Sequence, residues 1–274
     1  MMRVVLIDEE RKKDFSGVLP VDAEFGRQCI MLGAVDDEGR AVGSLIVSED
    51  AEQYSVEWLF VDVNARRQKA ATMLLQAFES LIGTIGIKPV RCYFEADAEG
   101  ILFSFFDSFD SPGFSCTTTF SHNRYRIPAR LFYESERLKK IRKNKLETKG
   151  FFDLPKKEQN RLLAMVSDSY YISDMKGWEA DCEKQLCLTV CSKDEPQAFL
   201  IVQKQGGKVL ELSFIYSATP NALYELLQTA AMVASEVCSD SVIVLDAVFP
   251  KAEILAKGFF ENTGVSHIYE AEFI

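Results

Sequence analysis

A short basic segment, residues 64–69, has the composition of an anion site. It contains the cationic side chains of Arg66, Arg67 and Lys69, and it runs into an apolar periodic segment that predicts a helix. The first N–H groups of a helix have no partner within the helix, and the helix dipole is positive at that end. The segment therefore favours a phosphate-like anion, although many surface loops carry such charges without a ligand.

A carboxylate, Glu57, lies within the apolar segment that precedes this turn. A carboxylate that is desolvated in an apolar strand holds a proton more readily, which suits a general base that works near neutral pH. The other interpretation is structural, with Glu57 paired or pointing to the rim of the strand. A similar apolar segment in the second half of the chain has Glu211 in the corresponding place. No basic turn follows Glu211, which favours a structural role for both glutamates. The sequence leaves the two interpretations open.

The elements on either side must position these groups. Residues 56–63 are apolar except for Glu57 and Asp62, which is typical of a strand buried on both faces of a sheet. After the turn, apolar residues recur at helical spacing and predict one buried stripe, and Gly83 predicts the end of the helix. The stripe consists of Ala71, Leu74, Leu75, Phe78, Leu81 and Ile82.

This strand, turn and helix resemble the signature of the GNAT N-acetyltransferase superfamily, V-x-P-x-x-R-G-x-G-x-G/A followed by a helix with L-L. Three positions depart from it: Val63 stands where proline is common, and Arg67 and Lys69 stand where glycines are common. Glycine lets the backbone approach a pyrophosphate closely, so Lys69 either supplies charge instead or marks a degenerate site. The matching residues are Val61, Arg66, Ala71, Leu74 and Leu75.

The resemblance implies acyl transfer from acetyl-CoA, as a co-substrate, to an amine on a small molecule or a peptide. It implies that the backbone of Phe60, Val61 and Val63 holds the pantetheine arm and the acyl carbonyl, and that the following turn holds the pyrophosphate. Glu57 is then the candidate catalytic base. The turn residues are Arg66, Arg67, Gln68, Lys69, Ala70, Ala71 and Thr72.

The family's usual general acid is a tyrosine, and Phe109 stands at its place. A phenylalanine donates no proton. Three outcomes are open: another group protonates the leaving thiolate, the thiolate needs no protein acid, or catalysis is lost.

The second half of the chain repeats the first in outline. Residues 210–215 match residues 56–61, and a helix and then a strand follow in both copies. In the second copy Thr219 predicts the helix N-cap and Pro220 its first position, but no Lys or Arg lies between Lys208 and Lys251. We therefore expect an α/β protein with mixed sheets and two GNAT-like domains in tandem. The acetyl-CoA-binding domain is expected at residues 1–132, and a degenerate domain at residues 133–274.

Turn residues and apolar patterns predict further elements. A hairpin is expected from residues 29–35 and 41–47, short helices at residues 9–19 and 21–28, and a closing hairpin at residues 116–132 that turns at residues 121–123.

Residues 133–161 differ from the rest of the chain in their positive charge. They contain ten Lys and Arg against five Asp and Glu, which predicts the connection between the domains. The alternative is a solvated helix face followed by a second helix that begins near Pro155. Few aromatic residues interleave with the charges, so a nucleic-acid patch is disfavoured.

Composition narrows the class of protein. With 47% hydrophobic residues the 274-residue chain can fill two cores, and its net charge of −10 disfavours nucleic-acid binding and favours cationic small substrates. No apolar run approaches a membrane span, and the four consecutive apolar residues after Arg3 are too few for a signal peptide, so we expect a cytoplasmic protein. Seven cysteines without a C-x-x-C pair, and only two histidines, predict reduced thiols and no metal site.

Two rival functions stay open. A non-catalytic module that binds CoA or a partner is favoured by Lys69 and by the missing tyrosine. A tandem-GNAT aminoacyltransferase would take aminoacyl-tRNA, and the basic residues 133–161 would then contact RNA.

Overall fold

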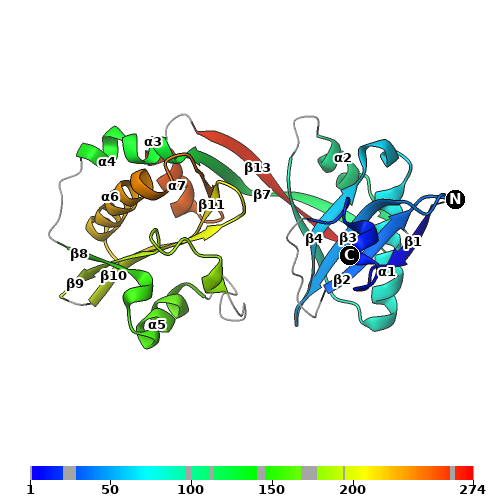
Figure 1. The fold of residues 1–274 in the computed structure, drawn as a ribbon, viewed down its shortest axis with the longest axis horizontal. Coiled ribbons are helices and arrows are strands. Elements are labelled where there is room, and N and C mark those ends of the chain that lie inside the picture. The colour runs from blue at the N-terminus through cyan, green and yellow to red at the C-terminus, as the bar shows by residue number, and fades with distance from the viewer. Residues whose placement is uncertain are drawn as a thin grey trace. The chain divides into compact units, whose positions relative to one another are not determined.

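The computed structural model describes residues 2–20, 29–96, 100–111, 114–140, 146–167, 178–193, 195–259 and 263–273. Strands and helices form an α/β fold with parallel and antiparallel strand pairs, which confirms the expected fold class (Figure 1). The chain divides into two compact units: unit 1 comprises residues 1–121 and 268–274, and unit 2 comprises residues 122–267. This division lies earlier than the expected one at residues 132 and 133, and it returns the C-terminal residues to unit 1.

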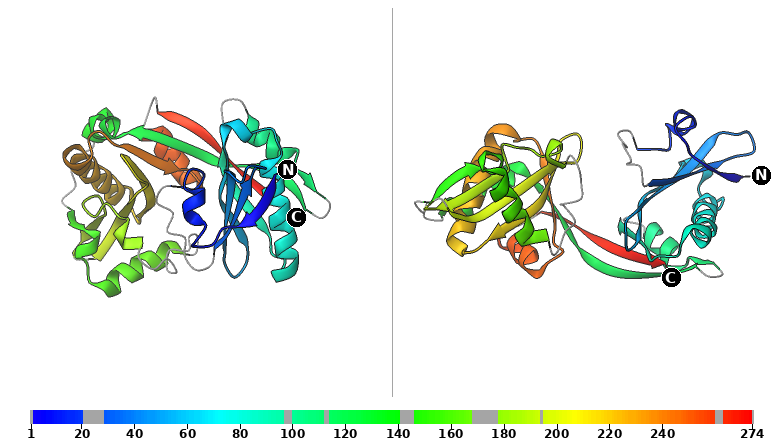
Figure 2. Two further views of the ribbon diagram at one scale, coloured as in Figure 1. Left: turned by 45° about the vertical axis from the view of Figure 1, so that its right-hand side comes forward. Right: turned by 90° about the horizontal axis from the view of Figure 1, so that it is seen from below.

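Unit 1 is built on a sheet with the strand order β1-β2-β3-β4-β5-β13, in which β4 and β5 are parallel. Figure 2 shows the ribbon from two further sides. Its strands are β1 (Arg3–Leu6), β2 (Cys29–Val35), β3 (Ala41–Glu49), β4 (Tyr54–Val61), β5 (Val90–Glu95) and the C-terminal part of β13 (Gly264–Phe273). Its helices are η1 (Lys12–Phe15), η2 (Val63–Ala65), α1 (Ala70–Ile85) and α2 (Ile101–Asp107), where η marks a 3-10 helix.

Four of the six residues of the apolar stripe predicted for α1 are buried, and the helix is longer than expected. It runs past Gly83 and ends at Gly86, whose φ of 140° is a conformation that favours glycine. The N–H of Gly86 donates to the carbonyl of Ile82 at 2.9 Å and closes the last turn. The buried members of the stripe are Leu74, Leu75, Phe78 and Ile82.

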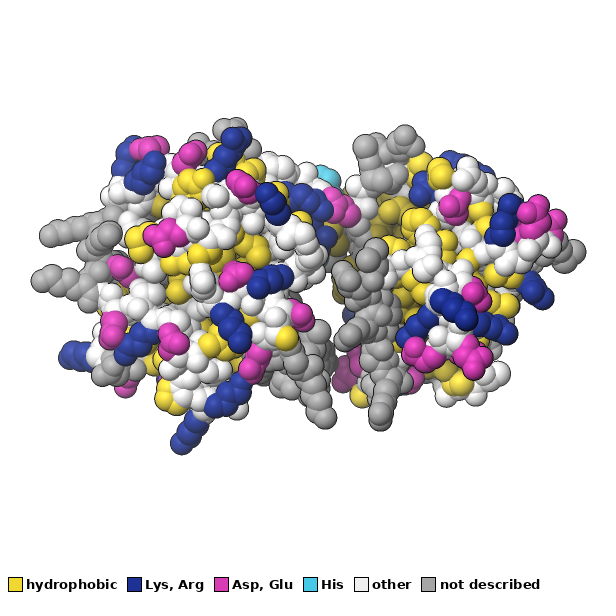
Figure 3. Space-filling model, viewed as in Figure 1, with side chains coloured by type: hydrophobic (Ala, Val, Ile, Leu, Met, Phe, Trp, Pro, Cys, Tyr) yellow, Lys and Arg dark blue, Asp and Glu magenta, His cyan; other side chains and the backbone are white. Residues whose placement is uncertain are grey.

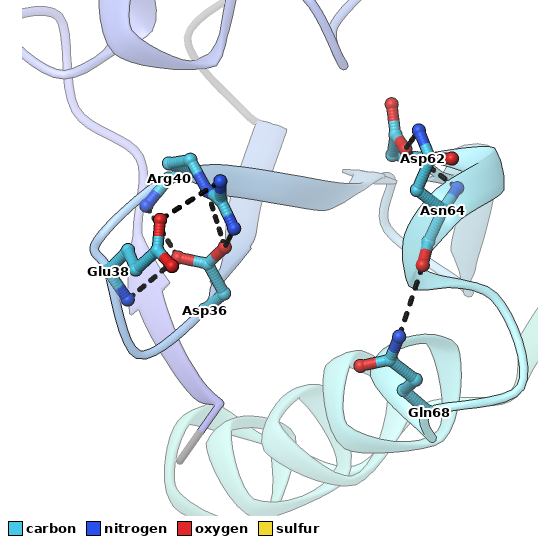
Figure 4. Close-up of polar contacts among 6 residues, drawn as sticks. All are labelled: Asp36, Glu38, Arg40, Asp62, Asn64 and Gln68. Atoms are coloured by element: carbon cyan, nitrogen blue, oxygen red, sulfur yellow. Dashed lines mark hydrogen bonds and ion pairs between the residues drawn. The ribbon is translucent and has the colours of Figure 1, made fainter.

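The predicted hairpin of β2 and β3 is confirmed, and one aspartate organises its turn (Figure 4). Asp36 Oδ1 accepts hydrogen bonds from the backbone N–H groups of Glu38 at 3.0 Å and Arg40 at 2.9 Å. Gly39 has φ 82°, which favours glycine at this place. These local contacts explain why this turn is readable from the sequence.

Unit 2 repeats the plan with the strand order β8-β9-β10-β11-β12-β7, in which β11 and β12 are parallel. Its strands are β7 (Phe114–Pro128, from His122 onward), β8 (Glu147–Gly150), β9 (Leu188–Ser192), β10 (Glu195–Lys204), β11 (Val209–Ser217) and β12 (Val242–Asp246). Its helices are α3 (Ala129–Glu134), α4 (Glu136–Lys140), η3 (Phe151–Asp153), α5 (Lys156–Ser167), η4 (Trp178–Ala180), α6 (Pro220–Val237) and α7 (Pro250–Phe259). In unit 1 the short strand β6 (Asp110–Ser111) pairs with the start of β7.

The two copies of the repeat exchange their last strands. In chain order β7 follows α2 of the first copy and β13 follows α7 of the second. However, β7 pairs antiparallel with β12, where Arg124 lies opposite Asp246, and β13 pairs antiparallel with β5, where Tyr269 lies opposite Phe94. Each copy therefore completes the sheet of the other.

This exchange shows that the closing hairpin expected at residues 116–132 is wrong. Residues 114–128 form one continuous strand, β7. The segment at residues 121–123 contains no glycine or proline to reverse the chain. The second half of β7 also has a hydrogen-bonding partner in β12, so it continues as a strand.

The basic residues 133–161 are not a connection between units, which corrects that expectation. Their described part belongs to unit 2 and is packed: Phe151 is 0% exposed and Leu138 is 3% exposed. Strand β8 pairs with β9, and α5 begins at Lys156, next to the proline that predicted a helix start. Most of the described charges are exposed, while apolar residues of the same elements fill the core.

The N-terminal segment is less helical than expected. Of the helix predicted at residues 9–19, the structure shows the short 3-10 helix η1, in which Phe15 is buried. The helix predicted at residues 21–28 lies outside the described residues. Within the described ranges, no helix is both long and apolar enough to cross a membrane.

Candidate functional site

Strands β4 and β5 of unit 1 pair only at their beginnings, and we call the space between them after these pairs the seam. They pair at Tyr54 with Val90 and at Ser55 with Arg91, and the described residues show no β4–β5 pair beyond that point. Strand β4 continues to Val61 while its other edge stays bonded to β3. The β5-facing peptide groups of β4 after Ser55 are therefore available to hydrogen-bond an extended chain that lies in the seam.

A β-bulge places Glu57 at the start of this seam. Ile46 of β3 lies opposite Trp58 and Val47 lies opposite Val56, so Glu57 is the extra residue. A bulge bends a strand and redirects its side chains, which is why bulges often lie next to functional sites.

Glu57 is exposed, so the expected desolvation within the apolar strand is wrong. Its neighbour Val56 is buried, and the bulge directs Glu57 away from the apolar core. Ser48 of β3 donates its hydroxyl to Glu57 Oε1 at 2.5 Å and so orients the carboxylate. Ser48 could not be assigned to the site from the sequence, because only the register of β3 with β4 brings it beside Glu57.

The negative charge of Glu57 contributes to the raised pKa values of two nearby thiols, those of Cys29 and Cys92. Burial raises the pKa of Cys29, and the negative charge of Glu57 adds to that rise. Burial is also the main cause that raises the pKa of Cys92 to about 12, with smaller contributions from Cys116 and Glu57. Both thiols are therefore protonated at neutral pH and are not nucleophiles of this site.

The turn after β4 is held by its own polar side chains (Figure 4). Asp62 Oδ1 accepts from the backbone N–H of Asn64 at 2.8 Å and starts η2. Gln68 Nε2 donates to the carbonyl of Asn64 at 3.1 Å, and Arg66 Nε donates to the carbonyl of Val61 at 3.2 Å. These contacts fold the turn back toward the end of β4 and bring residues 61–69 together.

The turn adopts a left-handed backbone at the two positions where the family signature has glycine. Arg67 has φ 63° and Lys69 has φ 68°. Among the described residues, the one further non-glycine residue with positive φ is Lys193. Each left-handed L-residue costs about 1–2 kcal/mol, and such strain clusters at functional sites. The conformation that glycine usually supplies is thus present here with cationic side chains.

Helix α1 begins directly after this turn, and no side chain caps it. Lys69 is the N-cap and makes no side-chain cap hydrogen bond. The N–H of Met73 bonds to the carbonyl of Lys69 at 2.9 Å, which leaves the three N–H groups of residues 70–72 outside the helical ladder. Arg66, Arg67 and Lys69 are exposed, and none forms an ion pair within the described ranges. The arrangement presents free donors and positive charge to an anion.

The structure places all the predicted site residues in one stretch of unit 1. Phe60 and Val61 end β4, with the ring of Phe60 stacked on Trp58 at 5.8 Å, and Val63 is 66% exposed in η2. The residues of the turn and of the first helical turn are Arg66, Arg67, Gln68, Lys69, Ala70, Ala71 and Thr72, of which Ala70 is buried.

The corresponding helix start in unit 2 is already satisfied, as the sequence predicted. Thr219 Oγ1 accepts from the N–H of Ala222 at 3.2 Å, and Pro220 brings no N–H. The hydroxyl of Ser217 donates to the carbonyl of Thr219 at 2.6 Å. This start therefore offers an anion fewer donors than α1 does, and it has no basic turn.

The register of unit 2 corrects the proposed equivalence of Glu57 and Glu211. Strand β11 also has a bulge, and there the extra residue is Ser213, because Ile201 lies opposite Phe214 and Val202 lies opposite Leu212. Glu211 lies two residues earlier, within the regular ladder. Burial raises the pKa of Glu211, and the charge of Asp246 adds to the rise.

Phe109 is a core residue. It is 6% exposed and meets the rings of Phe114 and Phe273 edge-on at 6.2 and 5.8 Å. It donates no proton, and its place in an aromatic cluster explains its type.

The described residues also contain no group of three or more His, Cys, Asp or Glu side chains that could hold a metal ion.

Searches against protein-family models and against curated proteins find no match for this chain. Solved structures match over its whole length. A tandem GNAT protein from the clavulanic acid biosynthesis pathway is 12% identical, with a TM-score of 0.66, over 99% of this chain and 98% of that chain. The chain has the fold of a tandem GNAT-like protein.

Further solved structures with a GNAT-related description share this fold. The GCN5-related glucosamine N-acetyltransferase region of a fungal multi-domain β-N-acetylglucosaminidase is 11% identical with a TM-score of 0.69, and this chain spans 38% of that chain's length. A GCN5-related N-acetyltransferase from Sphaerobacter thermophilus is 14% identical with a TM-score of 0.59, over 97% of this chain and 84% of that chain. The likeness concerns the fold and does not extend to the chemistry of the site.

Proposed function

We propose that this protein is an N-acyltransferase that moves an acetyl group from acetyl-CoA to an amine on a small molecule or a peptide. The observation that carries the proposal is the left-handed basic turn at residues 66–69, which leads into the uncapped start of α1 at the end of the open edge of β4. A pyrophosphate fits free N–H donors and cations, and an extended amide-containing arm fits an open strand edge.

Residues of unit 1 would hold the co-substrate. The backbone of Phe60, Val61 and Val63 would bond the pantetheine arm. The N–H groups and cations of residues 66–72 would bind the pyrophosphate, with Arg66 and Lys69 neutralising charge. When bound, acetyl-CoA supplies an acyl group that is already activated as a thioester.

Glu57 would act as the general base for the acceptor amine. An amine must lose its ammonium proton before it can attack, and Glu57 is an exposed carboxylate at the mouth of the seam that can accept this proton directly or through a water. Its hydrogen bond from Ser48 fixes the carboxylate while leaving the other oxygen to act. A negative site on a chain of net charge −10 attracts a cationic acceptor.

Isothermal titration calorimetry with acetyl-CoA tests the proposal. We expect one site per chain, because the helix start in unit 2 is capped and lacks the basic turn. Saturating acetyl-CoA should also raise the melting temperature, since it binds the folded state. Two equal sites, or no binding, would contradict the proposal, and a panel of amines then tests turnover.

A non-catalytic acyl-CoA-binding module is the second candidate. Phe109, which stands where the family has its proton donor, is buried among aromatic rings. This candidate would gain support if acetyl-CoA binds and no amine of a broad panel is acetylated.

The structure weighs against the aminoacyltransferase alternative. Several cations of residues 133–161 are engaged in local ion pairs, such as Lys139 with Glu136 at 3.2 Å and Lys149 with Glu147 at 3.3 Å. Cationic and anionic side chains are interspersed on the face drawn in Figure 3. RNA-binding surfaces typically cluster Lys and Arg on one face or along one helix.

A further inference from the structure

Unit 1 contains a cavity of about 550 Å³ at the end of α1 opposite the basic turn. Its volume lies within the range of small-molecule sites. Gly83, which lines it, is about 20 Å along the helix axis from the start of α1 at 1.5 Å per residue. The cavity is therefore distinct from the proposed acyl-CoA site.

The floor of the cavity is apolar and buried. Ile82, Phe114 and Phe273 line it, and they are 4%, 4% and 2% exposed. The rings of Phe114 and Phe273 are stacked with centroids 4.9 Å apart. Ile87, also part of the lining, is 84% exposed, so the cavity offers apolar surface to a ligand.

The polar part of the lining is negative. Two carboxylates, Glu79 and Glu272, and one lysine, Lys88, line the cavity. Lys88 Nζ donates to Glu49 at 2.6 Å and to the carbonyl of Asp50 at 2.7 Å, so its charge is paired with a carboxylate outside the cavity lining.

The two carboxylates keep an excess of negative charge. Glu272 shares a single guanidinium, that of Arg91, with Glu270, at 3.3 and 3.4 Å. Glu79 accepts a hydrogen bond from the hydroxyl of Ser111 at 3.0 Å and has no cationic partner among the described residues. A neutral hydroxyl leaves the charge of Glu79 uncompensated, so a cation gains by approaching it.

We propose that this cavity binds an amphipathic primary amine, with a compact apolar body against the apolar lining and its ammonium group beside Glu79 and Glu272. The charge excludes carboxylates and phosphates of the same shape. The apolar floor excludes bare ammonium ions, which gain nothing from its contacts. This binding site goes beyond the proposed acyl transfer and does not depend on it.

Gly83 offers a way to block the cavity without disturbing the fold. A Cβ atom added at Gly83 meets nothing within 4 Å, and the residue lies inside helix α1. Replacing a helical glycine also removes its propensity penalty, so both Gly83→Ala and Gly83→Phe are compatible with the helix. Only the phenylalanine side chain is large enough to enter the cavity.

Calorimetric titration of the full chain tests the proposal, with 2-phenylethylammonium as the probe and 3-phenylpropanoate as an anion of similar shape. We expect saturable binding of the amine and at least tenfold weaker binding of the anion. Gly83→Phe should abolish amine binding, while Gly83→Ala should retain it. Glu79→Gln, whose side chain still accepts from Ser111, should weaken binding about tenfold, as expected for the loss of one charge-assisted hydrogen bond.

Two further measurements separate this site from the acyl-CoA site. Gly83→Phe should leave acetyl-CoA affinity unchanged, and Glu57→Gln should leave affinity for the amine probe unchanged. The proposal is overturned if the amine shows no saturable binding, if Gly83→Phe binds it as tightly as the unmodified chain, or if the anion binds equally well. None of these results bears on acetyl-CoA binding.

Discussion

Glu57 and Ser213 occupy the same position in two repeated β-bulges, each being the extra residue opposite the hairpin strand that precedes it. The carboxylate is thus particular to unit 1, where the strand is followed by the basic turn. In unit 2 the bulge holds a serine and is followed by a capped helix. This difference assigns the candidate base to one unit.

The first prediction concerns Glu57→Gln. The substitution keeps the shape and the hydrogen bond from Ser48 but removes the basicity. Turnover should fall about 100-fold or more, the usual scale of general-base catalysis, while acetyl-CoA affinity stays nearly unchanged. Steady-state kinetics and calorimetry on the same preparation measure both.

The matched control for this prediction is Ser213→Ala, since Ser213 is the equivalent bulge residue. It should leave turnover unchanged. Full turnover of the Glu57→Gln variant would show that Glu57 is not the catalytic base. If the variant also had a lower melting temperature, the role of Glu57 would be structural.

The second prediction concerns the charge of the turn. Arg66→Glu places a carboxylate beside the proposed pyrophosphate position, so acetyl-CoA should bind at least tenfold more weakly while the fold persists. Lys251→Glu is the control, because it reverses a charge in the first turn of α7, in unit 2. Equal affinities for Arg66→Glu and the unmodified chain would place the pyrophosphate elsewhere.

A third prediction uses the left-handed backbone at Lys69. Lys69→Gly should raise the free energy of unfolding by about 0.5–1 kcal/mol, because glycine adopts φ 68° without the penalty of a Cβ atom. Lys193→Gly should also raise the free energy of unfolding, since φ is 52° there. Lys257→Gly, inside α7, should destabilise by about 1 kcal/mol. Urea unfolding measures all three, and a loss of stability for Lys69→Gly would show that its side chain stabilises the turn.

The fourth prediction is a pH dependence in unit 2. Burial would raise the pKa of Asp246, but hydrogen bonds and charge from Arg124 and His122 outweigh it and hold the pKa well below its usual value. Arg124 binds the carboxylate in two places, each at 2.7 Å. A carboxylate with a lowered folded-state pKa stabilises the fold above its unfolded pKa of about 3.9, and this contribution disappears as the pH falls through the lower, folded-state value.

Asp246→Asn should therefore cost about 2 kcal/mol of unfolding free energy at pH 7, and this cost should shrink as the pH falls below about 4. Chemical unfolding at a series of pH values measures the difference between variant and unmodified chain. A cost that is constant with pH would show that the Asp246 charge does not contribute.

The fifth prediction tests the exchanged strand. Phe273 lies in β13, is 2% exposed and packs on Phe106, Phe109 and Phe114 of unit 1. Phe273→Ala should cost about 3–5 kcal/mol, the usual loss for a buried aromatic ring. Phe120→Ala, at a ring that is 55% exposed, should cost far less. Similar melting temperatures for the two variants would contradict the packing of β13 in unit 1.

The sequence by itself determined the local elements of this protein. Apolar spacing predicted the stripe of α1, the turn residues around Asp36 predicted the β2–β3 hairpin, and Thr219 with Pro220 predicted the start of α6. Each of these depends on residues within a few positions of one another. Their physical causes, helical periodicity and side-chain capping, act within one element, so they can be read without the fold.

Only the tertiary structure decided how distant segments pair. The exchange of β7 and β13, the bulge that exposes Glu57, and the alignment of Glu57 with Ser213 all depend on strand register. A one-residue shift in register moves every side chain to the other face of the sheet, and a short apolar strand can pair with several others at similar cost. The choice is made by packing between segments that are far apart in the chain, which no local stretch of the sequence contains.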